Sequence, residues 1–253
     1  MNKDHLQQYL DEFLEINNFS DYGPNGLQID GKPEIKKIAF SVSATKSSAK
    51  KCVEEGADAL IVHHGLFWKF HGVRTLTGPF KDRVFPLVKN DINLFGYHLP
   101  LDAHPIVGNA QAIAEELSMN ELSAFGDHKG SPTGRRGKFS KPIKVSDLKK
   151  QLEEILDHPV LLSSPNPEQV VDSLGIITGG ANGDWVHCLK SDTQCYLTGE
   201  MSEHDWHEAQ ESGIHMMAGG HHATEKFGIQ KLQKHISKKF GVETVYLDSK
   251  NPA

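Results

Sequence analysis

The sequence predicts an α/β fold, and three observations support this prediction. Short apolar runs, such as residues 59–62, alternate with segments whose apolar residues recur at helical spacing. Glycine and other turn-forming residues separate the two kinds of segment. The order of strands and helices also repeats between the two halves of the chain. We therefore expect mixed sheets covered by helices, in two similar α/β domains that arose by internal duplication.

The first half begins with an amphipathic helix, because Leu6, Leu10 and Leu14 recur at helical spacing among polar residues. This helix ends before Asn18, and the turn-forming cluster 21–26 follows it. The remaining elements are predicted as strands at 35–42, 59–62 and 92–96 and helices at 47–55, 81–89 and 109–117.

The second half begins after residues 125–138, where several glycines and charged residues indicate a linker. We therefore expect a first domain at 1–125 and a second at 126–253. The second domain is predicted to contain helices at 145–156, 184–190, 202–212 and 224–240 and strands at 173–178, 194–198, 214–218 and 242–247.

The bulk properties indicate a cytoplasmic protein. The chain has 253 residues, a formal net charge of −6 and no apolar run long enough to span a bilayer. Neither membrane nor nucleic-acid binding is indicated. The N-terminal segment is polar and helical rather than a signal peptide. Three scattered cysteines, Cys52, Cys188 and Cys195, fit a reducing compartment.

Two motifs of the same design follow predicted strands in the two halves. One places His98 four residues before Asp102, and the other places His221 four residues before Glu225. A third apolar run ends in His63-His64. In parallel sheets, ligands bind beyond the carboxyl ends of the strands, so these side chains are expected to meet. Imidazole and carboxylate ligands without cysteine suit two divalent ions among Zn, Mn, Fe, Co and Ni.

Each motif also has a simpler interpretation. His63 and His64 can be ordinary loop histidines, although Gly65 would let the chain turn so that both rings reach one cavity. Asp102 can be a helix cap, and Pro100 argues that it lies just past a structured turn. Glu225 can stabilise a helix N-terminus, but its two oxygens also make it the best candidate to bridge two ions.

The motifs resemble those of the dinuclear-metal-centre hexamer family, known as GTP cyclohydrolase 1 type 2 homologues. The resemblance rests on residues 24–28, 62–65, 96–102, 178–180, 198–200 and 220–225. It implies a metal pair in the cleft between the domains and a toroidal homohexamer whose sites face an internal cavity. It further implies the ligands His63, His64, Asp102, His221 and Glu225. His98 then transfers protons or lies beside the ligands, and the internal repeat leaves ligation by His98 open.

The function expected from this resemblance is metal-dependent hydrolysis of a nucleotide or a related heterocycle, with His98 as the catalytic group. With GTP, the attack would open the purine's imidazole ring and release formate. The same site would also suit phosphoester hydrolysis. The alternative from a different class is a hexameric scaffold, metallochaperone or regulator that binds metal without turnover.

Overall fold

The computed structural model describes all 253 residues, which form two compact units. The first unit comprises Met1–Leu101 and Ile229–Lys250, and the second comprises Asp102–Gly228 and Asn251–Ala253. The domain boundary predicted after residue 125 lies between two strands of the second unit, and it stays a prediction. None of the helices is both long and apolar enough to cross a lipid bilayer.

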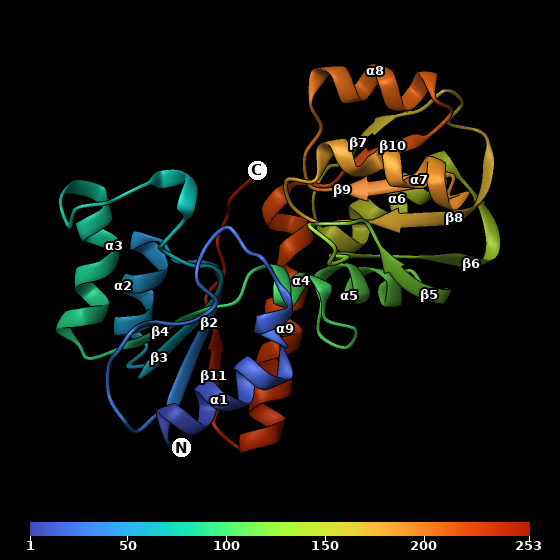
Figure 1. The fold of residues 1–253 in the computed structure, drawn as a ribbon. Coiled ribbons are helices and arrows are strands. Elements are labelled where there is room, and N and C mark those ends of the chain that lie inside the picture. Colours follow the sequence, from blue (N-terminus) through green and yellow to red (C-terminus); the bar gives the residue numbers. More distant parts are fainter. The chain divides into compact units, whose positions relative to one another are not determined.

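The first unit contains a five-stranded mixed sheet (Figure 1). Four strands are parallel because helices connect them, and the edge strand β1 is antiparallel to β4. The order across the sheet is β1 (Gly26–Ile29), β4 (Asn93–Gly96), β3 (Ala59–His64), β2 (Lys37–Ser43) and β11 (Glu243–Tyr246).

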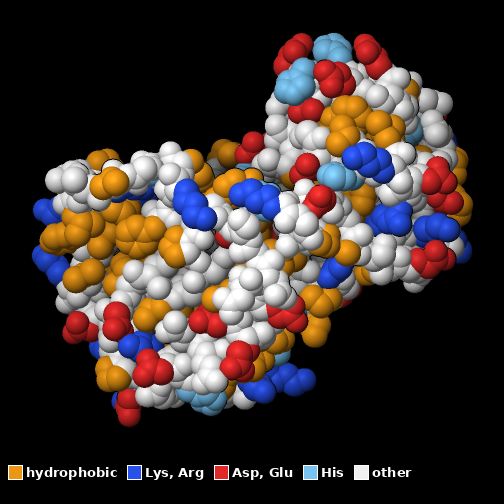
Figure 2. Space-filling model, viewed as in Figure 1, with side chains coloured by type: hydrophobic (Ala, Val, Ile, Leu, Met, Phe, Trp, Pro, Cys, Tyr) orange, Lys and Arg blue, Asp and Glu red, His pale blue; other side chains and the backbone are white.

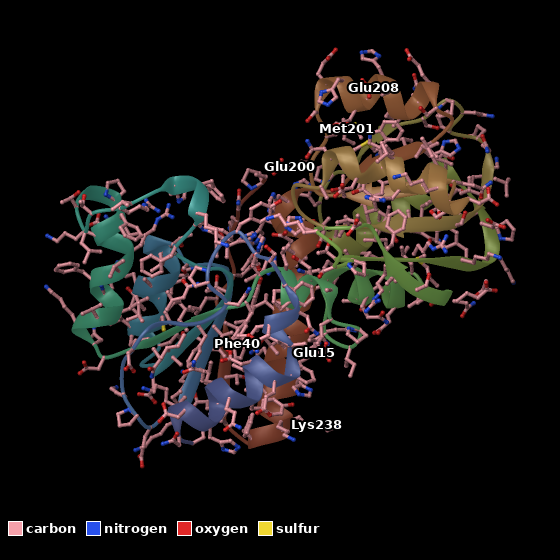
Figure 3. The ribbon with its side chains drawn as sticks, viewed as in Figure 1. Glu15, Phe40, Glu200, Met201, Glu208 and Lys238 are labelled. Carbon is pink, nitrogen blue, oxygen red and sulfur yellow. The ribbon has the colours of Figure 1, made fainter.

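Helices cover both faces of this sheet. The helices α2 (Lys46–Glu54) and α3 (Gly78–Lys89) pack on one face through buried residues that include Cys52 and Leu87. The helix α1 (Lys3–Phe13) and the C-terminal part of α9 (His221–Phe240) lie on the other face, toward which Phe40 points (Figures 1 and 3). Short 3-10 turns occupy Ile16–Asn18 and Lys69–His71.

The second unit contains a six-stranded mixed sheet. Its three central strands β8, β9 and β10 are parallel, and the strands at both sides are antiparallel to them. The order is β5 (Met119–Phe125), β6 (Gly134–Lys144), β8 (Val170–Ile176), β9 (Cys195–Thr198), β10 (His215–Ala218) and β7 (Leu161–Ser163).

The helices of the second unit also cover both faces of its sheet. One cluster contains α5 (Asn109–Glu116) and α6 (Val145–Leu156), whose leucines at 148, 152 and 156 are fully buried. The other contains α7 (Val186–Ser191), the preceding 3-10 turn Asn182–Trp185 and α8 (Glu203–Glu211). Glu208 lies on the outer, exposed side of α8 (Figure 3).

The α/β class with helix-covered mixed sheets is confirmed. The linker predicted at 125–138 is instead largely part of a hairpin, because β6 begins at Gly134 and pairs with β5. The strand orders β1-β4-β3-β2 and β7-β10-β9-β8 match, with the same antiparallel edge in each. This agrees with the expected internal duplication, which itself stays a prediction.

Candidate metal centre

Three histidines gather at the carboxyl ends of neighbouring strands in the first unit. His63 and His64 end β3, and their ring centroids are 4.5 Å apart. His98 follows β4, and its ring lies 5.1 Å from that of His63 and 5.7 Å from that of His64. One nitrogen of each ring lies within 4.8 Å of the other two, so this group could hold a metal ion.

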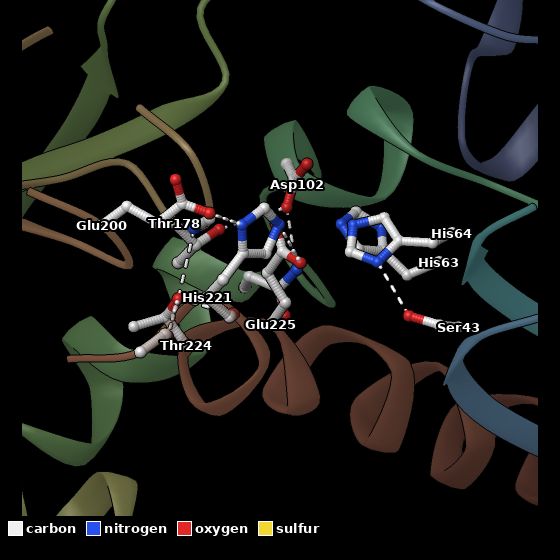
Figure 4. Close-up of polar contacts among 12 residues, drawn as sticks. Ser43, His63, His64, Asp102, Thr178, Glu200, His221, Thr224 and Glu225 are labelled. Atoms are coloured by element: carbon white, nitrogen blue, oxygen red, sulfur yellow. Dashed lines mark hydrogen bonds and ion pairs between the residues drawn. The ribbon is translucent and has the colours of Figure 1, made fainter. Parts of the chain in front are cut away.

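The Nδ1 atom of each ring has a hydrogen-bond partner from the same unit. The partners are the Tyr97 carbonyl oxygen for His63 (3.1 Å), Ser43 Oγ for His64 (3.0 Å) and Asp21 Oδ1 for His98 (2.7 Å). Such a bond fixes the ring orientation, and it is the usual arrangement where Nε2 binds a metal. Figure 4 shows the Ser43 contact on His64.

The carboxylate of Asp21, which the sequence analysis did not single out, organises the segment around His98. Its Oδ2 accepts hydrogen bonds from the backbone N–H of Leu99 and from Asn25 Nδ2. Asn25 Oδ1 in turn accepts the backbone N–H of His98. Burial raises the pKa of Asp21, but hydrogen bonds from His98, the His98 charge and the contact with Asn25 outweigh burial and lower it to about 2. The only sequence signal was the turn-forming cluster at 21–26.

The turn after β3 requires glycine at position 65. A Cβ atom there would lie 2.3 Å from the side-chain nitrogen of Gln28. Gln28 occupies this place because its Oε1 accepts the backbone N–H of Leu66 at 2.8 Å. The turn borders a cavity of about 10 Å³, lined by His63, His98 and Trp68 among others, which has room for about one water molecule.

In the second unit, His221 and Glu225 occupy the first turns of α9. His221 Nε2 lies 3.2 Å from Glu225 Oε2, in the helical i,i+4 relation expected from the sequence. Its Nδ1 contacts Glu200 Oε1 at 2.6 Å, so the ring lies between two carboxylates (Figure 4). Burial lowers the pKa of His221. Hydrogen bonding to Glu225, the charge of Glu225 and the contact with Glu200 outweigh burial and raise the pKa of His221 to about 9.

Asp102 brings a second carboxylate close to Glu225. One oxygen of each lies within 4.8 Å of the other. Asp102 Oδ1 accepts hydrogen bonds from Asn109 Nδ2 (2.8 Å) and Thr178 Oγ1 (3.2 Å). The prediction that Asp102 lies just past a turn is wrong, because it belongs to the short helix α4 (Leu99–Ala103). Pro100 is tolerated there because the first turn of a helix leaves its N–H groups unpaired.

Gly179 and Gly199 allow the backbone to approach Glu225 and His221 closely. Gly179 has φ +71°, and a Cβ atom there would lie 2.1 Å from Glu225 Oε1. A Cβ atom on Gly199 would lie 2.6 Å from the Cα of His221. Glycine is therefore needed for close approach at these two positions, which lie within the ranges 178–180 and 198–200 of the family resemblance.

The donors available in both units are imidazole nitrogens and carboxylate oxygens, which suit a divalent metal. The cysteines do not contribute: all three are buried, and burial raises the pKa of Cys52 and Cys188 to about 12. The structure thus brings His63, His64 and His98 together in the first unit. It brings Asp102, His221 and Glu225 together in the second.

Comparison with known proteins gives full-length matches. A family model described as Duf34/NIF3 (NGG1p interacting factor 3) matches residues 1–252. Proteins named GTP cyclohydrolase 1 type 2 homolog from Haemophilus influenzae and Escherichia coli K12 are 37% and 35% identical, with 100% of both chains covered. Two solved structures also match over 100% of both chains. They are protein ybgI of unknown function (36% identity, TM-score 0.92) and TTHA1606 from Thermus thermophilus (32%, 0.88).

Proposed function

This chain belongs to the Duf34/NIF3 family, and from that premise we propose that it is a metal-dependent hydrolase acting on a nucleotide or a related heterocycle. The observation that carries the proposal is the orientation of the histidines. His63 and His64 in one unit and His221 in the other each have Nδ1 bonded to a protein group. The other ring nitrogen, Nε2, is then the expected metal donor in all three, and in His221 it lies 3.2 Å from Glu225 Oε2.

We propose that His63, His64, Asp102, His221 and Glu225 hold two divalent ions in one centre. Chain connectivity supports a shared centre. His98 and Asp102 belong to one motif and lie only four residues apart, although the unit boundary falls between them, so their Cα atoms are at most about 14 Å apart. The two oxygens of Glu225 suit it to bridge the ions.

When bound, divalent ions lower the pKa of a water molecule to near neutrality and polarise the group that is attacked. The chain supplies the rest of the chemistry. Asp21 holds the His98 ring by Nδ1 at 2.7 Å, so Nε2 is the atom at which His98 accepts or donates a proton. Hydrogen bonds to Asp21 and the His98 charge outweigh burial and keep this carboxylate ionised, so that it accepts the hydrogen bond that orients the His98 ring.

The first test is the metal content per chain, measured by mass spectrometry of metals on protein purified without chelator. We expect about two ions in the wild type and a sharp loss in Glu225→Ala. Glu208→Ala, which removes an exposed glutamate on α8, should retain both ions. Absence of metal from the wild type after reconstitution with each candidate ion would contradict the proposal.

The second test is turnover, with GTP as the first substrate because the relatives are named after a GTP cyclohydrolase. Release of formate, inorganic phosphate and nucleoside is followed in parallel, so that the product identifies the bond that is broken. Full activity in an Asp102→Ala, Glu225→Ala double variant would exclude a role for these residues in the reaction.

We also propose a homohexamer, which is supported by the family resemblance. The measurement is the molar mass in solution by light scattering, expected to be six times the 28.0 kDa of one chain. A monomeric mass at micromolar concentration would contradict it.

A further inference from the structure

An exposed aromatic side chain lies close to the histidines of the first unit. Residues 65–77, which we call the aromatic loop, join β3 to α3. Within it, the Trp68 ring meets the His98 ring edge-on at 5.0 Å, and the Phe70 ring stacks on Trp68 at 5.5 Å with an interplanar angle of 20°. Phe70 is 69% exposed, which is unusual for a phenylalanine.

The aromatic loop is anchored to the turn that holds His98. The backbone N–H of Lys69 donates to the Tyr22 carbonyl oxygen at 2.8 Å, and Lys69 Nζ donates to the Asp21 carbonyl oxygen at 2.6 Å. Trp68 Nε1 donates to the Gly65 carbonyl oxygen at 3.1 Å. These bonds fix the position of the stacked rings relative to the histidines.

The sequence of the aromatic loop is cationic. Residues 65–77 contain Lys69 and Arg74 and no Asp or Glu, although the whole chain has a net charge of −6. Arg74 lies 4.0 Å over the Phe80 ring and 3.2 Å from His71 Nδ1, so its position is defined. Figure 2 shows hydrophobic side chains gathered where α3 and this loop lie. An exposed flat ring among positive charges complements a ligand with a flat, uncharged part and an anionic part.

We propose that the aromatic loop binds the base of a mononucleotide, which stacks on the Phe70 ring on the side away from Trp68 while the phosphates extend toward His64 and His98. Base–aromatic stacking needs only a π-face, and Arg74, which contacts the His71 ring beside Phe70, supplies positive charge for the phosphates. Phe70 offers a single platform, which suits one base rather than the successive bases of a nucleic acid. The inference rests on the proposed function for the position of the metal ions, but not for nucleotide binding itself.

This orientation selects the bond that is hydrolysed. Trp68 separates Phe70 from the histidines, at 5.5 Å from Phe70 and 6.0 Å from His64. A base on the far face of Phe70 is held away from His64, and the phosphates are the part that can reach it. Water therefore attacks the terminal phosphorus and the bridging P–O bond breaks. The products are the nucleotide shortened by one phosphate, inorganic phosphate and one proton.

The test is the Kd of a non-hydrolysable GTP analogue, measured by titration calorimetry on the metal-loaded full-length protein. Phe70→Ala should weaken binding about 5- to 150-fold, the range expected for one lost stacking contact. Phe70→Tyr keeps the ring and should bind within about twofold of the wild type. Val73→Ala, which truncates a fully exposed residue of the same loop, should change nothing. Tripolyphosphate, which has no base, should bind the wild type and Phe70→Ala equally.

Equal affinity of Phe70→Ala and the wild type for the analogue would overturn the proposal. So would a changed molar mass of Phe70→Ala with unchanged affinity, which would assign the loop to contacts between copies of the chain. Tighter binding of an oligonucleotide, or formate as the product, would overturn it as well. Nucleotide binding that depends on Phe70 but occurs without metal or turnover would contradict the proposed function and the assigned bond, and it would support the stacking site alone. Two bound ions without nucleotide binding would contradict only this inference.

Discussion

Replacing Asp21 with asparagine should destabilise the folded protein by about 2 kcal/mol at neutral pH. Hydrogen bonds from His98 and Asn25 and the His98 charge outweigh burial and lower the pKa of Asp21 from 3.8 to about 2. Each unit of such a shift corresponds to about 1.4 kcal/mol of stability. Because the folded pKa lies below the unfolded one, the ionised carboxylate stabilises the protein above about pH 4, and this contribution is lost as the pH falls toward 2.

The assay is urea unfolding of wild type and Asp21→Asn at several pH values from 7 down to 3. The difference in unfolding free energy should be largest at pH 7 and should shrink below pH 4. Asp30→Asn is the matched control, because its exposed ion pair with Lys3 should contribute less than about 1 kcal/mol. A difference that is absent at pH 7, or equally large at pH 3, would refute the reasoning.

Three further predictions concern the second unit. Glu200→Gln should weaken metal binding about 10- to 100-fold, measured by competition with a chelator, because the Glu200 carboxylate fixes the orientation of the His221 ring. Unchanged affinity would show that Glu200 does not position His221 for metal binding. Gly179→Ala should lose bound metal and lower the unfolding free energy by more than about 1 kcal/mol, because the added Cβ would overlap Glu225. Gly183→Ala, where the added Cβ meets open space, should change neither metal content nor stability. Leu156→Ala should cost about 2–5 kcal/mol in chemical denaturation, and a loss below about 1 kcal/mol would show that the site is not tightly packed.

The parts that were predicted from sequence depend on local patterns. Apolar spacing placed a helix at 145–156, where the structure has α6 (Val145–Leu156). The parallel strands were found because both their faces are buried, which gives continuous apolar runs. The histidines and carboxylates were found because they lie at, or shortly after, the carboxyl ends of such strands. Because β3 and β4 are parallel, they bring His63, His64 and His98 together at the carboxyl ends of the strands.

The parts that were missed depend on contacts between distant residues. β5 and β6 carry mostly exposed or half-buried side chains, so neither shows the apolar run or alternation of a buried strand. Their pairing with each other and of β6 with β8 holds them in the sheet. Asp21 acts on a ring that is 77 residues away in the chain, and no local pattern reports such a contact. Its turn-forming neighbours looked like an ordinary loop.

The hydrogen bonds that the chain makes to its histidine rings have a consequence for how the protein would acquire metal. Tyr97, Ser43, Asp21 and Glu200 orient the rings through groups that belong to the folded chain, so orientation does not depend on an ion. If the proposed ions bind, their uptake is separate from folding, unlike in a zinc finger, where the ion creates the fold. The proposal then implies that ions exchange in the folded protein. It also implies that the bound metal follows the free concentrations of competing ions as well as the ligand set.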